Sequence, residues 1–161
     1  SPAGTIAAHE IPAKPLDPYS YYNGDFIALE KAHLNKGWKL VDNWHPDNKA
    51  GKRNGFVDVP MLEATRPGDR LTLDFHGKAI GIFCVSGPSA GILEYSVDGA
   101  PFKELDTFTE WSHNLYIPWV YMLETELKDM DHKLVLRISK KKNPASQGTE
   151  CQIRNFVVNG R

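Results

Sequence analysis

The sequence lacks the surplus of one charge and the long apolar runs that mark several classes of protein. Its 19 basic and 20 acidic side chains leave a formal net charge of -1, whereas a nucleic-acid-binding domain usually carries a basic surplus. No apolar stretch approaches the roughly 18 residues that span a bilayer. We therefore expect a soluble domain that binds no nucleic acid and inserts into no membrane.

Cysteine is also scarce, with two residues in 161. Cys84 lies within the apolar run 79–85, where a buried free thiol is the expected state, and Cys151 opens a late strand-like segment. A disulfide between the two in an oxidising compartment stays open as the alternative. Thiol-based metal binding is not expected, because the sequence has no Cys-x-x-Cys pair and no neighbouring Cys/His cluster.

The first fifteen residues have the composition of a linker, with three prolines and several small residues. No signal peptide begins at Ser1, so we expect the sequence to be that of a mature protein's domain or of an excised fragment. We divide the chain into a linker at 1–15, leading from an absent upstream domain, and one domain at 16–161.

Alternation of apolar and polar residues with period two dominates the rest of the chain and predicts β-strands. Asp98-Gly99 lies between two such runs and is the residue pair that a type I′ hairpin turn requires. We expect Pro60 to stop the first of these strands. The predicted strands cover residues 56–60, 71–76, 79–85, 92–97, 100–105, 133–139 and 151–158.

Helical periodicity is rare. Residues 26–34 and 119–127 could form helices, but neither has a clean cap and both could be strands. Eight or so short strands, separated by glycine, proline and aspartate, predict an all-β fold, a two-sheet antiparallel β-sandwich.

One motif would make the chain an enzyme. Gly87-x-Ser89-x-Gly91 matches the nucleophile elbow of α/β-hydrolases, in which a strand precedes the serine and a helix follows it. After Gly91 the chain alternates with period two and enters the hairpin, so no helix can begin at Ser89. We interpret the motif as a loop between two strands.

A second motif also resembles a catalytic one but lacks a necessary part. Asp129-x-x-His132 matches the acid and base pattern of GDSL-type hydrolases, but no Gly-Asp-Ser block supplies the nucleophile. Gly24-Asp25-Phe26 has phenylalanine at that position, which no base can activate. We therefore expect His132 at the edge of a turn that leads into the strand at 133–139.

The hairpin and the later strands form an ordered series that resembles a known domain type. It is similar to the galactose-binding-like jelly roll of carbohydrate-binding modules, and more narrowly to the C-terminal accessory domain of bacterial GDSL-type (SGNH) hydrolases. In that group, 15–21 marks the start of the domain and Gly37-Trp38 an early strand. The series comprises residues 94–102, 105–112, 115–123, 127–138 and 148–159.

This resemblance implies a jelly-roll sandwich in a periplasmic or extracellular setting. It also implies a partner, the catalytic GDSL-type domain of the same polypeptide, and no catalytic role for this chain. Two alternatives stay open: a stand-alone carbohydrate-binding module, and a self-sufficient hydrolase that uses Ser89 and His132. The resemblance implies no particular ligand.

Binding of sugar needs aromatic platforms beside hydrogen-bonding groups, because pyranose rings expose apolar C–H faces and polar hydroxyls. The same aromatic residues suit an interface with the missing domain, and the sequence leaves both uses open. We expect Trp38 and Trp119 to be packed, and Trp44 and Trp111 to be more accessible. The candidates are Trp44, His45, Arg53, Trp111, His113, Asn114 and Trp119.

Carboxylates that could bind calcium are scattered along the chain. Asp17, Asp25 and Asp106 have no spacing that would gather a shell of six to eight oxygen ligands. We therefore predict no metal and no cofactor.

Overall fold

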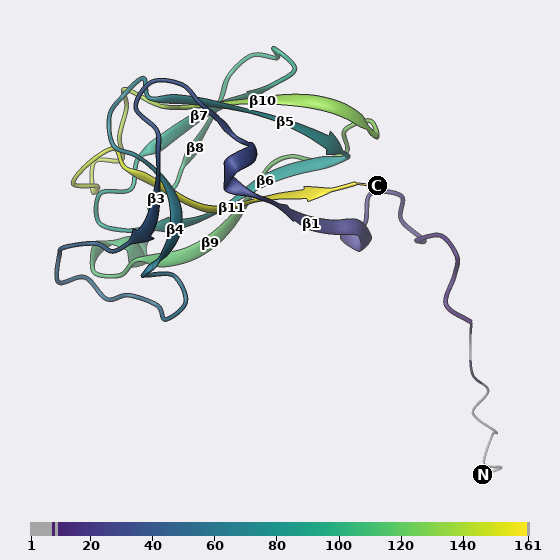
Figure 1. Ribbon diagram of the computed structural model, residues 1–161, viewed down its shortest axis with the longest axis horizontal. Coiled ribbons are helices and arrows are strands. Elements are labelled where there is room, and N and C mark those ends of the chain that lie inside the picture. Colours follow the sequence, from purple (N-terminus) through teal and green to yellow (C-terminus); the bar gives the residue numbers. More distant parts are fainter. Residues whose placement is uncertain (1–7, 9, 161) are drawn as a thin grey trace, which may run out of the picture.

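The chain folds into two antiparallel sheets packed face to face, as the period-two alternation predicts (Figure 1). The structure, a computed structural model, describes residue 8 and residues 10–160, and this part of the chain contains no α-helix. The strands are β1 (Gly24–Ile27), β2 (His33–Leu34), β3 (Lys39–Trp44), β4 (Val59–Ala64), β5 (Arg70–Gly77), β6 (Ala79–Ser86), β7 (Ile92–Val97), β8 (Lys103–Asp106), β9 (Ile117–Glu124), β10 (Met130–Ile138) and β11 (Cys151–Asn159). The short 3-10 helices are η1 (Tyr21–Asn23), η2 (Leu29–Lys31) and η3 (Glu110–His113).

The two sheets differ in how the chain builds them. Sheet A has the order β3-β4-β11-β6-β9, and β1 pairs with the second half of β11. Sheet B has the order β2-β5-β10-β7-β8 and forms the upper layer in Figure 1. Most neighbours within a sheet are distant in sequence, which is the arrangement of a jelly roll and confirms the predicted fold class.

The core lies between the inner faces of the sheets. In β5 the predicted inward residues Leu71 and Leu73 have no exposed surface, and in β10 the same holds for Leu134 and Leu136. Phe156 of β11 is the largest side chain that is fully buried against them. Burying such side chains is the main contribution to the stability of a sandwich of this size.

The predicted hairpin is confirmed. Asp98 and Gly99 have φ angles of 53° and 76°, the positive values that a type I′ turn needs at both central positions. β7 and β8 pair across this turn, with Tyr95 opposite Lys103.

Neither of the two segments that could have been helices forms an α-helix. Residues 26–34 form the end of β1, η2 and β2, and residues from 119 to 124 belong to β9. The prediction that Pro60 ends a strand is wrong, because β4 begins at Val59 and continues through it. Pro60 lies where the register between β3 and β4 shifts and before the pairing of β4 with β11 begins, so its missing N–H breaks no regular ladder.

The predicted linker lies at one end of the sandwich. Residues 10–19 are exposed and run away from the sheets (Figure 1). Residues 1–7 and 9 lie outside the described part of the chain, so the division at residue 15 stays a prediction. Among the described residues, none belongs to a helix of the length and apolarity needed to cross a membrane.

Candidate functional site

The Gly87-x-Ser89-x-Gly91 motif forms the connection between β6 and β7, as predicted. The Ala90 N–H donates to the Gly87 carbonyl at 3.0 Å and closes a tight turn, after which β7 begins at Ile92. No helix follows Ser89, so its surroundings have none of the free helical amides that build an oxyanion hole.

Close packing explains why the motif needs both glycines. A Cβ on Gly87 would lie 2.1 Å from the ring of Tyr116, and a Cβ on Gly91 would lie 2.7 Å from the backbone of Thr149. The motif is therefore a point where the 114–116 segment and the 148–150 segment press against the β6–β7 loop.

His132 is engaged elsewhere, and the prediction that it lies at the edge of a turn is wrong. It is the third residue of β10 and only 7% exposed. Its Nδ1 lies 2.6 Å from the Asp98 carboxylate and its Nε2 lies 2.8 Å from the Lys128 carbonyl. Because both neighbours are acceptors, the ring is positively charged when it donates to both.

The acid of the second motif contacts a different histidine. Asp129 lies 3.5 Å from Nε2 of His76, whose Nδ1 lies 2.8 Å from Asp131. Ser89 therefore has no imidazole partner in the described structure, and the chemistry of an acid–base–nucleophile triad is not assembled.

A polar cleft of about 590 Å³ lies over the outer face of sheet A, and we call it the Glu150 cleft. Its volume is within the range of small-molecule sites. Five segments that are far apart in sequence meet there, because β3, β4 and β11 are neighbours and the loops before and after them lie at the same end. The lining side chains include Lys39, Trp44, His45, Glu63, Ser89, Tyr116, Glu150 and Gln152.

Hydrogen bonds join these side chains into a row. Oε1 of Glu63 accepts from the indole N–H of Trp44 at 3.1 Å, and its Oε2 lies 3.0 Å from Nζ of Lys39. The amide nitrogen of Gln152 donates to Glu63 at 3.5 Å and to Oε2 of Glu150 at 3.3 Å. Burial raises the pKa of Glu150, the hydrogen bond from Gln152 offsets part of this rise, and the charge of Glu63 adds to it.

The loop at 45–58 closes one side of the cleft and is fastened at several points. The side-chain amide of Asn48 donates to the Tyr116 hydroxyl at 2.7 Å, and the Gly51 N–H donates to the Asn114 carbonyl at 2.7 Å. Beneath the loop, the Trp44 and Tyr116 rings meet edge to face at 5.4 Å. These contacts hold the wall in one position, which favours binding without a large ordering cost.

The sequence candidates separate into two groups in space. Trp44 and His45 line the Glu150 cleft, but Trp44 is only 4% exposed, so the expectation of an accessible indole is wrong. Its N–H is satisfied by Glu63, and packing beneath the 45–58 loop covers its ring. His45 is paired with Asp58 at 2.9 Å, and Arg53 is exposed on the loop.

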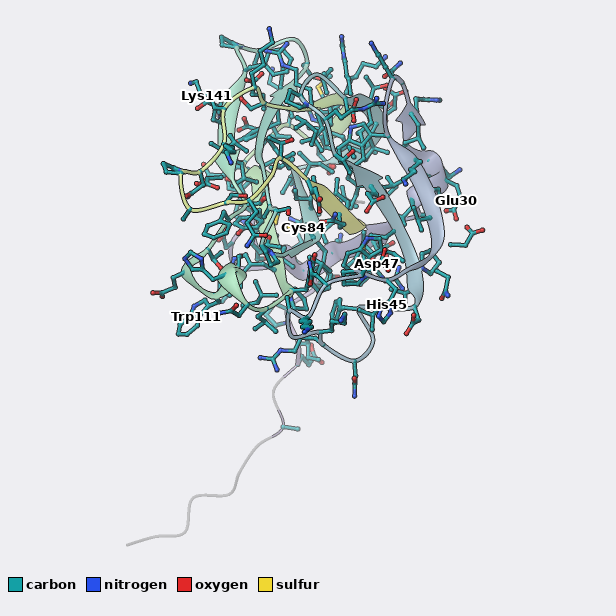
Figure 2. The ribbon with its side chains drawn as sticks, turned by 90° about the vertical axis from the view of Figure 1, so that its left-hand side faces the viewer. Glu30, His45, Asp47, Cys84, Trp111 and Lys141 are labelled. Atoms are coloured by element: carbon teal, nitrogen blue, oxygen red, sulfur yellow. The ribbon has the colours of Figure 1, made fainter. Side chains whose placement is uncertain are left out.

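The other candidates do not line the cleft. Trp111 on η3 is 61% exposed, and Figure 2 shows it at the lower left of the molecule, well separated from His45. Trp119 is 49% exposed, so the expectation that it is packed is wrong: it lies on β9, the outermost strand of sheet A. His113 rests edge to face on Phe108, and Asn114 contributes its carbonyl to the loop contact.

Sequence reasoning missed the polar row itself. Glu63 and Gln152 occupy outward positions of β4 and β11 between buried residues, which is the ordinary pattern of a half-buried strand. The alternation of polar and apolar residues predicts that Glu63 and Gln152 point outward, but it does not predict which residues lie beside them. The pairing of Gln152 with Glu63 depends on the order of the strands in the sheet. Glu150 is adjacent to the predicted strand at 151–158 and had no signal of its own.

The carboxylates considered for calcium are each used locally. Asp17 and Asp106 accept backbone N–H groups two residues ahead, and Asp25 accepts the next one. Within the described residues, His, Cys, Asp and Glu form no group of three or more that could hold a metal ion.

Both cysteines are free and buried on the adjacent strands β6 and β11. Burial raises the pKa of Cys84 to about 12 and also raises the pKa of Cys151 well above its ordinary value. Thiols in this state are unreactive and pack as small apolar groups.

The outer face of sheet A carries a second feature, an apolar face formed by Tyr21, Phe26, Val120, Met122 and Val157. Phe26 is 61% exposed and Val120 is 45% exposed at its centre.

Sheet B has a different outer face, which is covered by ion pairs. Arg137 pairs with Glu94, Lys133 lies 3.7 Å from Asp74, and Lys141 lies 2.6 Å from Glu104. Within the described residues, sheet A thus carries an apolar face and a polar cleft on its outer side, whereas the outer side of sheet B carries ion pairs.

Comparison with known proteins supports the fold and no closer relationship. No family model matches the chain, and no curated protein matches it. A two-domain esterase (CEX) active on acetylated mannans has a similar solved structure, with a TM-score of 0.61 and 17% identity over 100% of this chain and 42% of that one. A family two carbohydrate esterase from Cellvibrio japonicus has a TM-score of 0.50 and 12% identity over 86% of this chain and 34% of the other.

An exo-beta-1,3-galactanase from Phanerochaete chrysosporium is also similar, with a TM-score of 0.52 and 11% identity over 83% of this chain and 29% of that one. This chain thus spans less than half the length of each of these structures. At these identities the likeness shows a shared fold, a β-sandwich that in each case is one part of a larger carbohydrate-active enzyme.

Proposed function

We propose that this chain is a non-catalytic accessory module of a carbohydrate-active enzyme and that the Glu150 cleft binds carbohydrate. The observation that carries the proposal is the row of Glu63, Gln152 and Glu150 beside Ser89 in a cleft of about 590 Å³. Carboxylates accept hydrogen bonds from sugar hydroxyls, and amides and hydroxyls both donate and accept, so the row matches the chemistry of a pyranose edge.

The geometry supports this use over a catalytic one. Among the described residues no histidine is hydrogen-bonded to the Ser89 hydroxyl, since His132 is bound to Asp98, and the buried thiols are unreactive. The aromatic rings of the cleft are buried under the 45–58 loop, so polar contacts dominate the site. This argues for a cleft that recognises hydroxyl groups rather than one that stacks sugar rings on an open platform.

The comparisons add support of a general kind. One similar structure, of the esterase active on acetylated mannans, was co-crystallised with mannopentaose, and the galactanase holds galactose. We infer from this, and from the resemblance of the sequence to accessory domains, that the companion is a GDSL-type esterase domain in the same polypeptide. Such an enzyme would act on glycans outside the cytoplasm, in the periplasm or beyond the cell.

Calorimetric titration of the chain with mannopentaose and with galactose tests the proposal. We expect binding by the wild type and a dissociation constant raised by about tenfold or more in Glu150→Gln, because a hydrogen bond to a charged group is lost. Asp131→Asn, an exposed change on sheet B, is the matched control and should bind as the wild type does. Absence of binding to both sugars and to acetylated mannan would refute the carbohydrate-binding proposal.

Trp111→Ala tests whether sugar binds in the Glu150 cleft or at the exposed indole of Trp111. Because Trp111 does not line the cleft, we expect this variant to keep the wild-type affinity. A loss confined to Trp111→Ala would move the site to η3.

The apolar face favours a second role, contact with the companion domain. Tyr21 is part of this face and closely follows the exposed 10–19 segment in sequence. A domain attached through that segment would therefore be held within reach of Phe26 and Val120. In the two-domain polypeptide, Phe26→Ser should speed proteolysis of the segment between the domains. An unchanged cleavage rate would speak against this contact.

A residual esterase activity is excluded most cheaply with p-nitrophenyl acetate. We expect the chain to release p-nitrophenol no faster than a Ser89→Ala variant. Turnover that this substitution abolishes would revive the hydrolase alternative.

A further inference from the structure

Charge is distributed unevenly among the residues that line the Glu150 cleft. Three of them are carboxylates, Asp47, Glu63 and Glu150. The two basic lining residues are already paired: Lys39 lies 3.0 Å from Glu63, and His45 lies 2.9 Å from Asp58. No lining residue is therefore an unpaired cation within the described part of the chain.

The other basic groups of the loop do not change this balance. Lys49, Lys52 and Arg53 are not among the lining residues, and Nζ of Lys52 donates to the Asn48 carbonyl at 3.1 Å. An arriving carboxylate would meet fixed negative charge and no free ammonium or guanidinium group to receive it.

Glu150 is the carboxylate with hydrogen-bonding capacity to spare. Glu63 has both of its oxygens occupied by Trp44, Lys39 and Gln152. Glu150 uses only Oε2, toward Gln152 at 3.3 Å, which leaves Oε1 open on the cleft side.

A donor and an acceptor line the cleft at this point. The backbone N–H of Glu150 donates to the Ser89 carbonyl at 2.7 Å, so the two residues adjoin, and the side chains of both line the cleft. A sugar hydroxyl can donate to the carboxylate while a neighbouring one accepts from the serine, so the pair suits vicinal hydroxyls.

We propose that the Glu150 cleft selects uncharged sugars and rejects uronic acids, with Glu150 as the residue that discriminates between them. This inference rests on the proposed carbohydrate-binding function and names its ligand class. A hexose presents only hydroxyls to Glu150, whereas a hexuronate brings a second carboxylate into a site whose cations are neutralised. The cleft walls exclude part of the solvent, so the repulsion is screened less than at an open surface.

Matched sugars that differ only at C6 test this inference. We would titrate the chain by calorimetry at pH 7 with β-1,4-linked mannopentaose and with the corresponding pentamer of mannuronic acid, and by NMR with galactose and galacturonic acid. We expect the acidic member of each pair to bind at least about tenfold more weakly, which corresponds to repulsion between like charges in a partly desolvated site.

Two variants assign the effect. Glu150→Gln keeps the shape and one acceptor of the side chain but removes its charge. The ratio of the dissociation constants of the acidic and the neutral sugar, which we call the gap, should therefore decrease severalfold, even though the neutral sugar itself binds less tightly. Asp25→Asn removes an exposed carboxylate from β1, outside the cleft, and should leave the gap unchanged.

The outcomes separate this inference from the function on which it rests. Equal or tighter binding of the uronates overturns the inference and leaves carbohydrate binding intact. A gap that persists in full in Glu150→Gln overturns the role of Glu150. Failure of both neutral sugars and both uronates to bind overturns the inference together with the proposed function.

Discussion

At the scale of single residues, two features of this chain imitate enzyme motifs for structural reasons. Gly87 and Gly91 give the spacing of a nucleophile elbow, yet each is glycine because another segment packs directly on it. Asp129 and His132 have the spacing of an acid and a base, yet each contacts a different partner. Short motifs of this kind carry functional meaning only when the surrounding elements match.

Gly87→Ala should destabilise the protein and deform the cleft. The added methyl group would collide with the Tyr116 ring, which anchors the 45–58 loop through Asn48. Overpacking of this kind costs about 1–3 kcal/mol in the free energy of unfolding. Urea denaturation measures it, and Gly24→Ala is the control, because a Cβ there has its closest contact at 3.3 Å. Equal stabilities of the two variants would contradict the packing role of Gly87.

The pair of His132 and Asp98 should give the stability a maximum in mildly acidic solution. Burial opposes the charge on His132, but the hydrogen bonds to Asp98 and to the Lys128 carbonyl outweigh it, so the pKa of His132 is raised. The hydrogen bonds from His132 and from the Lys133 N–H lower the pKa of Asp98.

These shifts in pKa determine how the stability changes with pH. The contribution of His132 is complete below its ordinary pKa of about 6.5 and is lost as the pH rises through the raised value. The contribution of Asp98 is complete above its ordinary pKa of about 3.9 and is lost as the pH falls through the lowered value.

Asp98→Asn should flatten this profile. Asparagine tolerates the positive φ of the turn and can still accept from His132, so the variant removes the charge and keeps the geometry. We expect the wild type to lose about 0.5–1 kcal/mol more than the variant between pH 6 and 9, a small value because the Asp98 carboxylate is half exposed. Parallel profiles in thermal denaturation across this range would contradict the charged pair.

At the scale of elements, the loop at 45–58 decides the shape of the cleft. It lies over outward-facing side chains of sheet A, including Met61 and Val85, which would otherwise be exposed. Its attachment to the 114–116 segment links the connection before β9 to the connection before β4. A loop that covers apolar surface and is hydrogen-bonded at both sides is part of the fold rather than a mobile cover.

Tyr116→Phe should loosen this loop without unfolding the domain. The change removes the hydroxyl that accepts from the Asn48 amide at 2.7 Å and keeps the aromatic packing on Trp44. We expect hydrogen exchange of the 45–58 amides to accelerate about fivefold, as the loss of one hydrogen bond implies. Tyr121→Phe, whose hydroxyl donates to the Thr107 carbonyl at 3.4 Å, should leave these amides unaffected. Acceleration in both variants would show that the effect is not local.

At the scale of the whole molecule, the two outer faces have different characters. Sheet B is covered by ion pairs, which suits contact with water, whereas sheet A has both a polar cleft and an apolar face. Exposed apolar surface of this kind on one side of a small domain marks a contact surface.

Phe26→Ser should reduce the binding of a hydrophobic dye such as ANS while changing the free energy of unfolding by no more than about 0.5 kcal/mol, as is usual for an exposed position. Phe102→Ser is the control, because Phe102 is 42% exposed on the side of sheet B and is covered in part by Arg137. Equal dye fluorescence of Phe26→Ser and the wild type would show that the apolar face is not accessible as described.

The sequence alone determined several strands and their faces, among them β5 and β10, but not the bounds of β4. The alternation of Leu71 and Leu73, and of Leu134 and Leu136, has one solution in a sandwich, since a period of two leaves only one face for the core. Asp98-Gly99 likewise determined the hairpin, because few residues adopt a positive φ. The absence of a helix after Ser89 followed from the same local rules.

Only the tertiary structure decided the candidate site. Glu63, Glu150 and Gln152 become neighbours because β4 pairs with β11, although Glu63 and Gln152 are 89 positions apart in sequence. Such long-range pairing is typical of a jelly roll, whose neighbouring strands are mostly distant in sequence. The burial of Trp44 and the exposure of Trp119 also depend on tertiary structure. The 45–58 loop folds over the indole of Trp44, and Trp119 lies on an edge strand of sheet A that leaves its indole exposed. The residues next to them in sequence indicate neither arrangement. Local patterns determine what a residue can be, and long-range pairing determines what it meets.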